Sequence, residues 1–308
     1  MNKRERVAAA LAGEPVDRVP VSAWFHFPAD RRGGEGLAEA LYGLFTEVDF
    51  DFVKVMNDNP YVDPMVKEVK MPGDLVMLAE VDLAAGPMAP TIDGVERLRA
   101  KTGPDVMITV TIFNTFATGQ KLSNGHLAEY VAADAATVKK GLGTVAANLA
   151  GFAEAVIRAG ADGIFLAADG SGDSVFEPGV YRDVFRPGDL AILEGASAGS
   201  FNIVHVHGMD TDFDNFIDYP AHAINWADRT AGPSIAEAKT KLDHCLVAGV
   251  DHLGTIAAGS PDEIRAEVRD AIAQSGGRRF ILGPGCSVPN DIDRSRLRVM
   301  REAVEGAL

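Results

Sequence analysis

The stretch Ala159-Gly160-Ala161-Asp162-Gly163-Ile164-Phe165-Leu166-Ala167-Ala168-Asp169 contains the pattern on which the fold depends. A long helical segment, expected over residues 134–159, stops at Gly160, and an apolar run over residues 163–167 follows it directly. An apolar run of this length without polar alternation is typical of a parallel strand that is buried on both faces. The stretch therefore predicts a helix that leads into a parallel strand, with Asp169 at the carboxyl end of that strand.

Short apolar runs of this kind recur along the chain, with helical segments between most of them. The predicted strands cover residues 19–25, 51–56, 106–113, 163–167, 202–207, 223–226, 246–250 and 280–282. Repeated strand–helix units predict a parallel sheet with right-handed crossovers. Eight units favour closure of the sheet, and no Gly-x-Gly-x-x-Gly follows the first run as it would in a dinucleotide-binding fold. We predict an α/β protein with a (β/α)8 TIM barrel, built as one domain over residues 1–308.

The helix expected between the last two strands has the clearest boundaries. Ser260-Pro261-Asp262-Glu263 is a capping box with proline at the first helical position. Apolar residues then recur at helical spacing until Gly276-Gly277, which predicts the carboxyl end of the helix.

The composition excludes several classes of partner. The chain has 308 residues, of which 47% are apolar, and its 29 basic and 44 acidic residues give a net charge of −15. This acidic excess argues against nucleic acid or an anionic membrane as the main partner. No run of about 18 apolar residues predicts a membrane span, and the amino-terminal residues lack an apolar secretion signal. Two cysteines far apart in sequence, Cys245 and Cys286, indicate a reducing cytoplasm.

Polar side chains follow most of the predicted strands. In a barrel, the residues just beyond the strands line one shared mouth, where the active site lies. We expect side chains there to act in catalysis (Asp58, Asp169 and Asn225), to bind a cofactor (His26, Asn114 and His252) or to bind a metal (His205, His207 and Cys286).

The segment Ile203-Val204-His205-Val206-His207 is the sharpest of these features. Side chains alternate between the two faces of a strand, so both histidines point into the mouth, about 7 Å apart along the strand. Two such imidazoles either share a metal ion or form hydrogen bonds in a polar pocket, and the motif alone leaves both interpretations open.

Cys286 follows an apolar strand and a Gly-Pro-Gly turn, which presents its thiol at the rim. Cys245, inside an apolar run, is expected to be a core residue. With His205 and His207, Cys286 would give zinc three protein ligands and one open position, as in catalytic zinc sites. An open zinc site favours the deprotonated form of a bound thiol or water.

The motifs together resemble the uroporphyrinogen decarboxylase superfamily, over nearly the whole chain. The resemblance is carried by Arg4-Glu5-Arg6-Val7, Ala10-Leu11-Ala12-Gly13-Glu14-Pro15-Val16-Asp17-Arg18-Val19-Pro20-Val21, Asp49-Phe50-Asp51-Phe52, Ala159-Gly160-Ala161-Asp162-Gly163, Asn225-Trp226 and Ile281-Leu282-Gly283-Pro284-Gly285-Cys286. It implies a (β/α)8 barrel, in agreement with the strand count.

The superfamily contains two main chemistries. True decarboxylases hold substrate carboxylates with an arginine-rich segment after the first strand, of which only Arg31 remains here. Asp58 matches the aspartate that meets the pyrroles in those enzymes, whereas Pro284 replaces their histidine near the carboxyl-terminal glycine motif.

Cobalamin-dependent methyltransferases form the other branch and bind zinc through a His-x-Cys-Gly motif and a Gly-Cys. The matching positions are His205, His207 and Cys286, so histidine replaces the middle cysteine. A set of two nitrogens and one sulfur is less electron-rich, and we expect it to make a bound thiolate less nucleophilic.

The leading hypothesis is a zinc-dependent methyltransferase that moves a methyl group between cobalamin, free or on a corrinoid protein, and a small-molecule acceptor. Asp58, Asp169 and Asn225 would orient the acceptor or a metal ligand. Two alternatives stay open: a cofactor-free decarboxylase of a porphyrinogen or another carboxylated aromatic, and a non-catalytic tetrapyrrole or corrinoid carrier. The sequence leaves open the donor, the acceptor, the metal and the oligomeric state, a homo-oligomer included.

Overall fold

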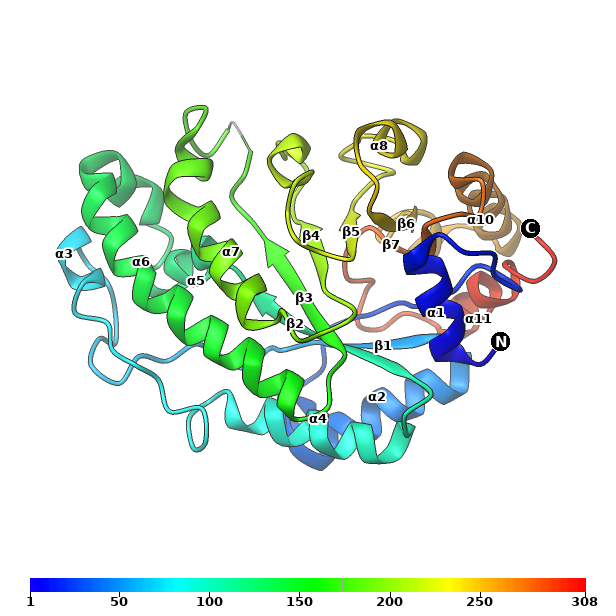
Figure 1. Cartoon of the computed structure of the whole chain (residues 1–308), viewed down its shortest axis with the longest axis horizontal. Coiled ribbons are helices and arrows are strands. Elements are labelled where there is room, and N and C mark those ends of the chain that lie inside the picture. The colour runs from blue at the N-terminus through cyan, green and yellow to red at the C-terminus, as the bar shows by residue number, and fades with distance from the viewer. Residues whose placement is uncertain (173) are drawn as a thin grey trace.

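A parallel β-sheet forms the centre of the molecule (Figure 1). The computed structural model describes residues 1–172 and 174–308. The seven strands are hydrogen-bonded in chain order, and each runs parallel to its neighbours. They are β1 (Phe52–Val55), β2 (Met107–Phe113), β3 (Gly163–Ala168), β4 (Ile203–Val206), β5 (Ala223–Trp226), β6 (Cys245–Val250) and β7 (Phe280–Pro284). The predicted α/β class and seven of the eight predicted strands are therefore confirmed.

The first predicted strand, over residues 19–25, is wrong as a strand. Val21 forms one isolated parallel bridge with Leu282 of β7, and the carbonyl of Val21 accepts a hydrogen bond from the backbone of Asp51, just before β1. The segment thus lies between the two edge strands without a regular ladder. Two features interrupt it: Pro20 has no N–H to donate, and the N–H of Val21 donates to the Asp51 carboxylate at 2.8 Å.

Helices surround the sheet, and most of them cover its outside (Figure 1). They are α1 (Lys3–Ala12), α2 (Gly34–Val48), α3 (Pro72–Leu75), α4 (Ala89–Thr102), α5 (Thr115–Leu122), α6 (Leu127–Arg158), α7 (Arg186–Gly195), α8 (Ile235–Lys241), α9 (Thr255–Ala258), α10 (Pro261–Ser275) and α11 (Arg294–Glu302). Within the described ranges, none is long and apolar enough to cross a membrane.

Local signals explain two helix boundaries. In α10, Ser260 and Glu263 form the predicted capping box, and Gly276 ends the helix in the left-handed region with φ 64°. The helix predicted from residue 134 is the longer part of α6, which bends at Asp134, where Thr137 N–H donates to the aspartate side chain at 3.0 Å. Sequence reasoning missed the turns before this bend because Asp134 itself is a capping signal.

The sheet separates two apolar clusters. In β1, Phe52 joins the inner cluster, whereas the next residue, Val53, joins the larger cluster under the helices. Val7 and Ala10 of α1 also belong to the inner cluster, so α1 closes the inside of the sheet at the amino ends of its strands. The carboxyl ends stay free for polar side chains, which is where the candidate site lies.

Candidate metal centre

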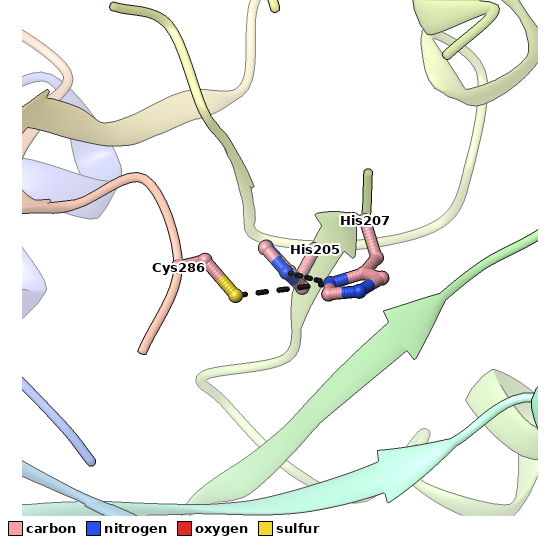
Figure 2. A group of neighbouring side chains, drawn as sticks. All are labelled: His205, His207 and Cys286. Atoms are coloured by element: carbon pink, nitrogen blue, oxygen red, sulfur yellow. Dashed lines mark hydrogen bonds between the residues drawn. The ribbon is translucent and has the colours of Figure 1, made fainter. Parts of the chain in front are cut away.

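Three side chains meet at the carboxyl ends of β4 and β7. Figure 2 shows His205, which lies on β4, and His207, which directly follows the strand. Cys286 approaches both from the loop after β7. One ligand atom from each residue lies within 4.8 Å of the other two. The structure therefore brings the three predicted metal ligands together, although 79 residues separate His207 from Cys286.

The alternation of side chains along β4 directs both imidazoles inward. Ile203 belongs to the inner apolar cluster, whereas Val204 and Val206 pack in the outer one. His205 shares the inward face and is 3% exposed. The N–H of His207 donates to the carbonyl of Ala168 at 2.9 Å. This bond continues the pairing with β3, so the side chain of His207 faces inward like that of His205.

Asn225 of β5 sets the orientation of His205. The Asn225 side-chain nitrogen donates to the carbonyls of Val247 at 2.6 Å and Pro284 at 3.1 Å, so its oxygen faces the imidazole. That oxygen lies 2.6 Å from His205 Nδ1. Because an amide oxygen only accepts, Nδ1 carries a proton, and Nε2 is the nitrogen that faces the cluster and offers a lone pair when the ring is neutral. The His205 ring also stacks on Phe165, with a centroid distance of 5.1 Å.

The ligand atoms of the three side chains lie close to one another. His205 Nε2 lies 3.1 Å from His207 Nδ1, and Cys286 Sγ lies 3.7 Å from the same nitrogen (Figure 2). Two imidazole nitrogens and one sulfur are donors that suit zinc, and three protein ligands leave the fourth tetrahedral position for a substrate.

The cluster favours the ionised form of Cys286, which metal binding needs. Burial opposes ionisation of Cys286. In the metal-free protein, however, hydrogen bonds from His205 and His207 and the positive charge of their protonated rings lower its pKa to about 4. The pKa of His207 is raised, chiefly by its hydrogen bond to Cys286 and against the effect of burial. The thiol is therefore a thiolate at neutral pH, the form that binds metals and attacks electrophiles.

Lys54 is a neighbour of this centre that sequence reasoning missed. It lies on the inward face of β1 and is 4% exposed. Its Nζ lies 4.6 Å from the centroid of Phe165 and 5.7 Å from that of Trp24, and it donates to Met56 Sδ at 3.3 Å. Burial lowers the pKa of Lys54 to about 7, against the effect of the negative charges of Cys286 and Asp58. The sequence contains one feature that could have indicated Lys54 as a site residue: it is a lysine in the middle of the apolar run Phe52-Val53-Lys54-Val55-Met56.

Two predicted site residues lie close to the cluster without a hydrogen bond to it among the described residues. The negative charge of Asp169 helps to raise the pKa of His207, while its carboxylate accepts the N–H of Gly170 at 2.8 Å. His252 follows β6 and is buried, which lowers its pKa, whereas the charge of Cys286 raises it. Asp169 therefore acts on the centre through its charge, whereas His252 is influenced by the charge of Cys286.

The remaining predicted residues have other partners. Asn114 caps α5 by accepting a hydrogen bond from the N–H of Ala117, and its amide nitrogen donates to Tyr181 and to the carbonyl of Asp169. Its hydrogen-bonding groups therefore serve to stabilise the fold. His26 and Asp58 lie 2.6 Å apart and form a pair of their own at the mouth.

Comparisons with known proteins agree with this architecture. Residues 46–307 match the family model described as uroporphyrinogen decarboxylase (URO-D). A methyltransferase from Methanosarcina mazei has a similar structure, with a TM-score of 0.81 and 17% identity over 99% of this chain and 98% of that chain. A B12-independent methionine synthase from a Shewanella species reaches a TM-score of 0.61 at 13% identity, over 94% of this chain and 97% of that one.

A putative B12-independent methionine synthase from Listeria monocytogenes is also similar, with a TM-score of 0.59 and 14% identity over 86% of this chain and 84% of that one. No curated protein sequence matches the chain. At these identities the structural neighbours show a shared fold. The family model covers most of the sequence, and the chain belongs to the uroporphyrinogen decarboxylase (URO-D) family.

Proposed function

We propose that the protein is a zinc-dependent methyltransferase. It would move a methyl group between a corrinoid and a small-molecule acceptor that zinc activates. The observation that supports this most is the cluster of His205, His207 and Cys286, whose ligand atoms lie within 4.8 Å of one another. In this proposal, the sheet and residues 19–25 act as one (β/α)8 barrel and one domain, with the cluster in its mouth.

The donor set fits zinc on chemical grounds. Cys286 supplies a thiolate, and Asn225 holds His205 in the tautomer that leaves Nε2 free. When bound, zinc would lower the pKa of a thiol or water in the open fourth position. We place the protein in the cytoplasm, where the reducing conditions keep a cysteine such as Cys286 in its reduced form.

The rim of the mouth suits a flat, largely apolar donor. Val175, Met209 and Leu253 lie in the loops after β3, β4 and β6 and are exposed large apolar side chains. We propose that these residues contact the corrin ring of cobalamin, free or on a partner corrinoid protein. Large exposed apolar side chains near a polar site commonly mark binding surfaces.

Metal analysis of purified protein tests the proposal. We expect about one zinc per chain in the wild type, little in His207→Ala and Cys286→Ala, and an unchanged content in the matched control Cys245→Ala, because Cys245 lies in the core. Methylcobalamin and 2-mercaptoethanol then serve as donor and acceptor, with loss of methylcobalamin followed by absorbance. Metal-free protein that transfers the methyl group at the full rate would overturn the proposal.

The family match favours decarboxylation as a second candidate, because the matching family model is named for that activity. Uroporphyrinogen would then be converted to coproporphyrinogen without a metal. Incubation with uroporphyrinogen separates the two candidates, since only the decarboxylase forms this product and remains active after chelation of zinc.

A further inference from the structure

A histidine and a carboxylate outside the set of three metal ligands form a tight pair at the mouth. His26 follows the segment 19–25, and Asp58 lies just beyond β1. His26 Nδ1 and Asp58 Oδ1 are 2.6 Å apart, and the two side chains are 43% and 12% exposed. The imidazole is therefore open to a ligand, whereas the carboxylate behind it is largely shielded.

Backbone contacts tie this pair to the loop that carries Cys286. The N–H of His26 donates to Asn290 Oδ1 at 3.0 Å, and the N–H of Val288 donates to the carbonyl of Trp24 at 3.0 Å. Cys286 precedes both loop residues. The segment with His26 and the loop with Cys286 thus run side by side, and both side chains belong to the same rim.

The pairing decides which nitrogen of His26 is free. Burial alone would raise the pKa of Asp58, but the hydrogen bond to His26 and the charge of Arg32 lower it, so the carboxylate is ionised. An ionised carboxylate only accepts, so Nδ1 of His26 carries a proton, and Nε2 is the nitrogen with the lone pair in the neutral ring. This is the arrangement by which an aspartate prepares a histidine to act as a base.

The second carboxylate oxygen shows that the pair is not optimised for stability. Asp58 Oδ2 is buried and has no hydrogen-bond partner among the described residues. A buried acceptor without a partner costs free energy, and such costs concentrate at functional sites. Arg32 and Lys54 are the cations whose charges act on this carboxylate.

We propose that His26 is the base that accepts the proton of the methyl acceptor, and that Asp58 positions it. This inference rests on the proposed function and identifies the acceptor as a molecule with an ionisable X–H group, such as a thiol. The X–H bond breaks, the proton moves to His26 Nε2, and the electron pair stays on X. The X–CH3 bond then forms while the bond from methyl to the corrinoid donor breaks, leaving its electron pair on the donor.

The role differs from the one that the family resemblance implied for Asp58. A carboxylate that meets the substrate directly needs free oxygens directed into the mouth. Here one oxygen is hydrogen-bonded to His26 and the other is buried. His26 is therefore the group of this pair that touches the acceptor.

Two thiols of different acidity test the base in the zinc-loaded enzyme. With an alkyl thiol such as 2-mercaptoethanol, we expect His26→Gln and Asp58→Asn to lower kcat/KM by about 10²-fold, the usual contribution of a general base. With thiophenol, which is largely ionised at neutral pH, the same variants should lose little, because no proton has to be removed. His126→Gln is the matched control, since His126 pairs with Glu129 at 3.1 Å on an exposed helix end.

A readout independent of activity tests the pair itself. Nitrogen NMR of labelled histidine should show His26 protonated at Nδ1 in the wild type and at Nε2 in Asp58→Asn, with zinc content unchanged in both variants. Equal losses with both thiols, or a wild-type His26 protonated at Nε2, would overturn the base assignment while methyl transfer stands. A zinc-loaded wild type that transfers methyl to neither thiol overturns the proposed function, and the base assignment with it.

Discussion

The chemistry of Cys286 is set by the two imidazoles that face it, and it should be visible without any substrate. Because His205 and His207 lower its pKa to about 4, the metal-free protein should react with iodoacetamide at Cys286 at about pH 6, where an ordinary thiol is protonated. Burial raises the pKa of Cys245 to about 12, so this cysteine should stay unmodified. Mass spectrometry of the labelled peptides measures both, and a rate that rises only above about pH 8 would contradict the thiolate assignment.

In the proposed metal centre, Asn225 orients His205. Asn225→Ala removes the acceptor of the Nδ1 proton, and we expect zinc affinity to fall by about 10–100-fold, as for other partners of metal-binding histidines. Competition with a zinc chelator measures the change. Asn148→Ala is the control, because Asn148 is also buried and hydrogen-bonded but lies on α6. An equal loss in the two variants would mean that the effect comes from general destabilisation.

At the level of elements, Asp51 holds the segment 19–25 between β7 and β1. Its carboxylate is fully buried, bonds to Arg6 and Arg18 at 2.7 and 2.6 Å, and accepts the N–H of Val21 at 2.8 Å. Asp51→Asn removes the negative charge that balances the two buried guanidinium groups of Arg6 and Arg18. We expect the free energy of unfolding to fall by about 3–5 kcal/mol.

Urea denaturation measures this loss, and hydrogen exchange should show faster opening of the Val21 and Ser22 amides. Asp17→Asn provides the comparison, because Asp17 also pairs with Arg6 but is 43% exposed. A half-exposed pair of this kind should contribute at most about 1 kcal/mol. Similar losses in the two variants would show that Asp51 does not anchor the segment.

At the level of the whole molecule, the buried Lys54 should make global stability depend on pH. Burial holds its pKa at about 7 in the folded protein, against about 10.4 in the unfolded chain. Between these pH values the unfolded chain binds a proton that the folded protein does not, so the contribution of Lys54 to stability rises with pH. Lys54→Met has no amine to keep neutral in the folded protein. Its free energy of unfolding should therefore exceed that of the wild type by about 1–4 kcal/mol near neutral pH.

The advantage of Lys54→Met should shrink as the pH approaches about 10, where the unfolded chain also loses the proton. Urea denaturation of the metal-free proteins across this range measures it, and Lys139→Met, at an exposed position of α6, should match the wild type throughout. A variant whose advantage is the same at every pH would contradict the neutral state of the buried amine.

The sequence alone determined the α/β class, the positions of seven strands, the ends of α10 and the three candidate metal ligands. These features depend on local patterns: apolar runs, capping residues, and the alternation that directs His205 and His207 to one face. Each pattern is contained in a few consecutive residues, and burial then follows from the period of the element.

Only the tertiary structure decided the rest. Residues 19–25 read as a strand, but the Asp51 carboxylate, 30 residues away from Val21 in sequence, takes the N–H that a ladder would use. Lys54 became part of the site because the curvature of the sheet placed it beside Phe165, and His26 met Asp58 across 32 residues. A charge's partner, and therefore its pKa and its role, depends on distances that arise only when distant segments pack together, and no local pattern encodes them.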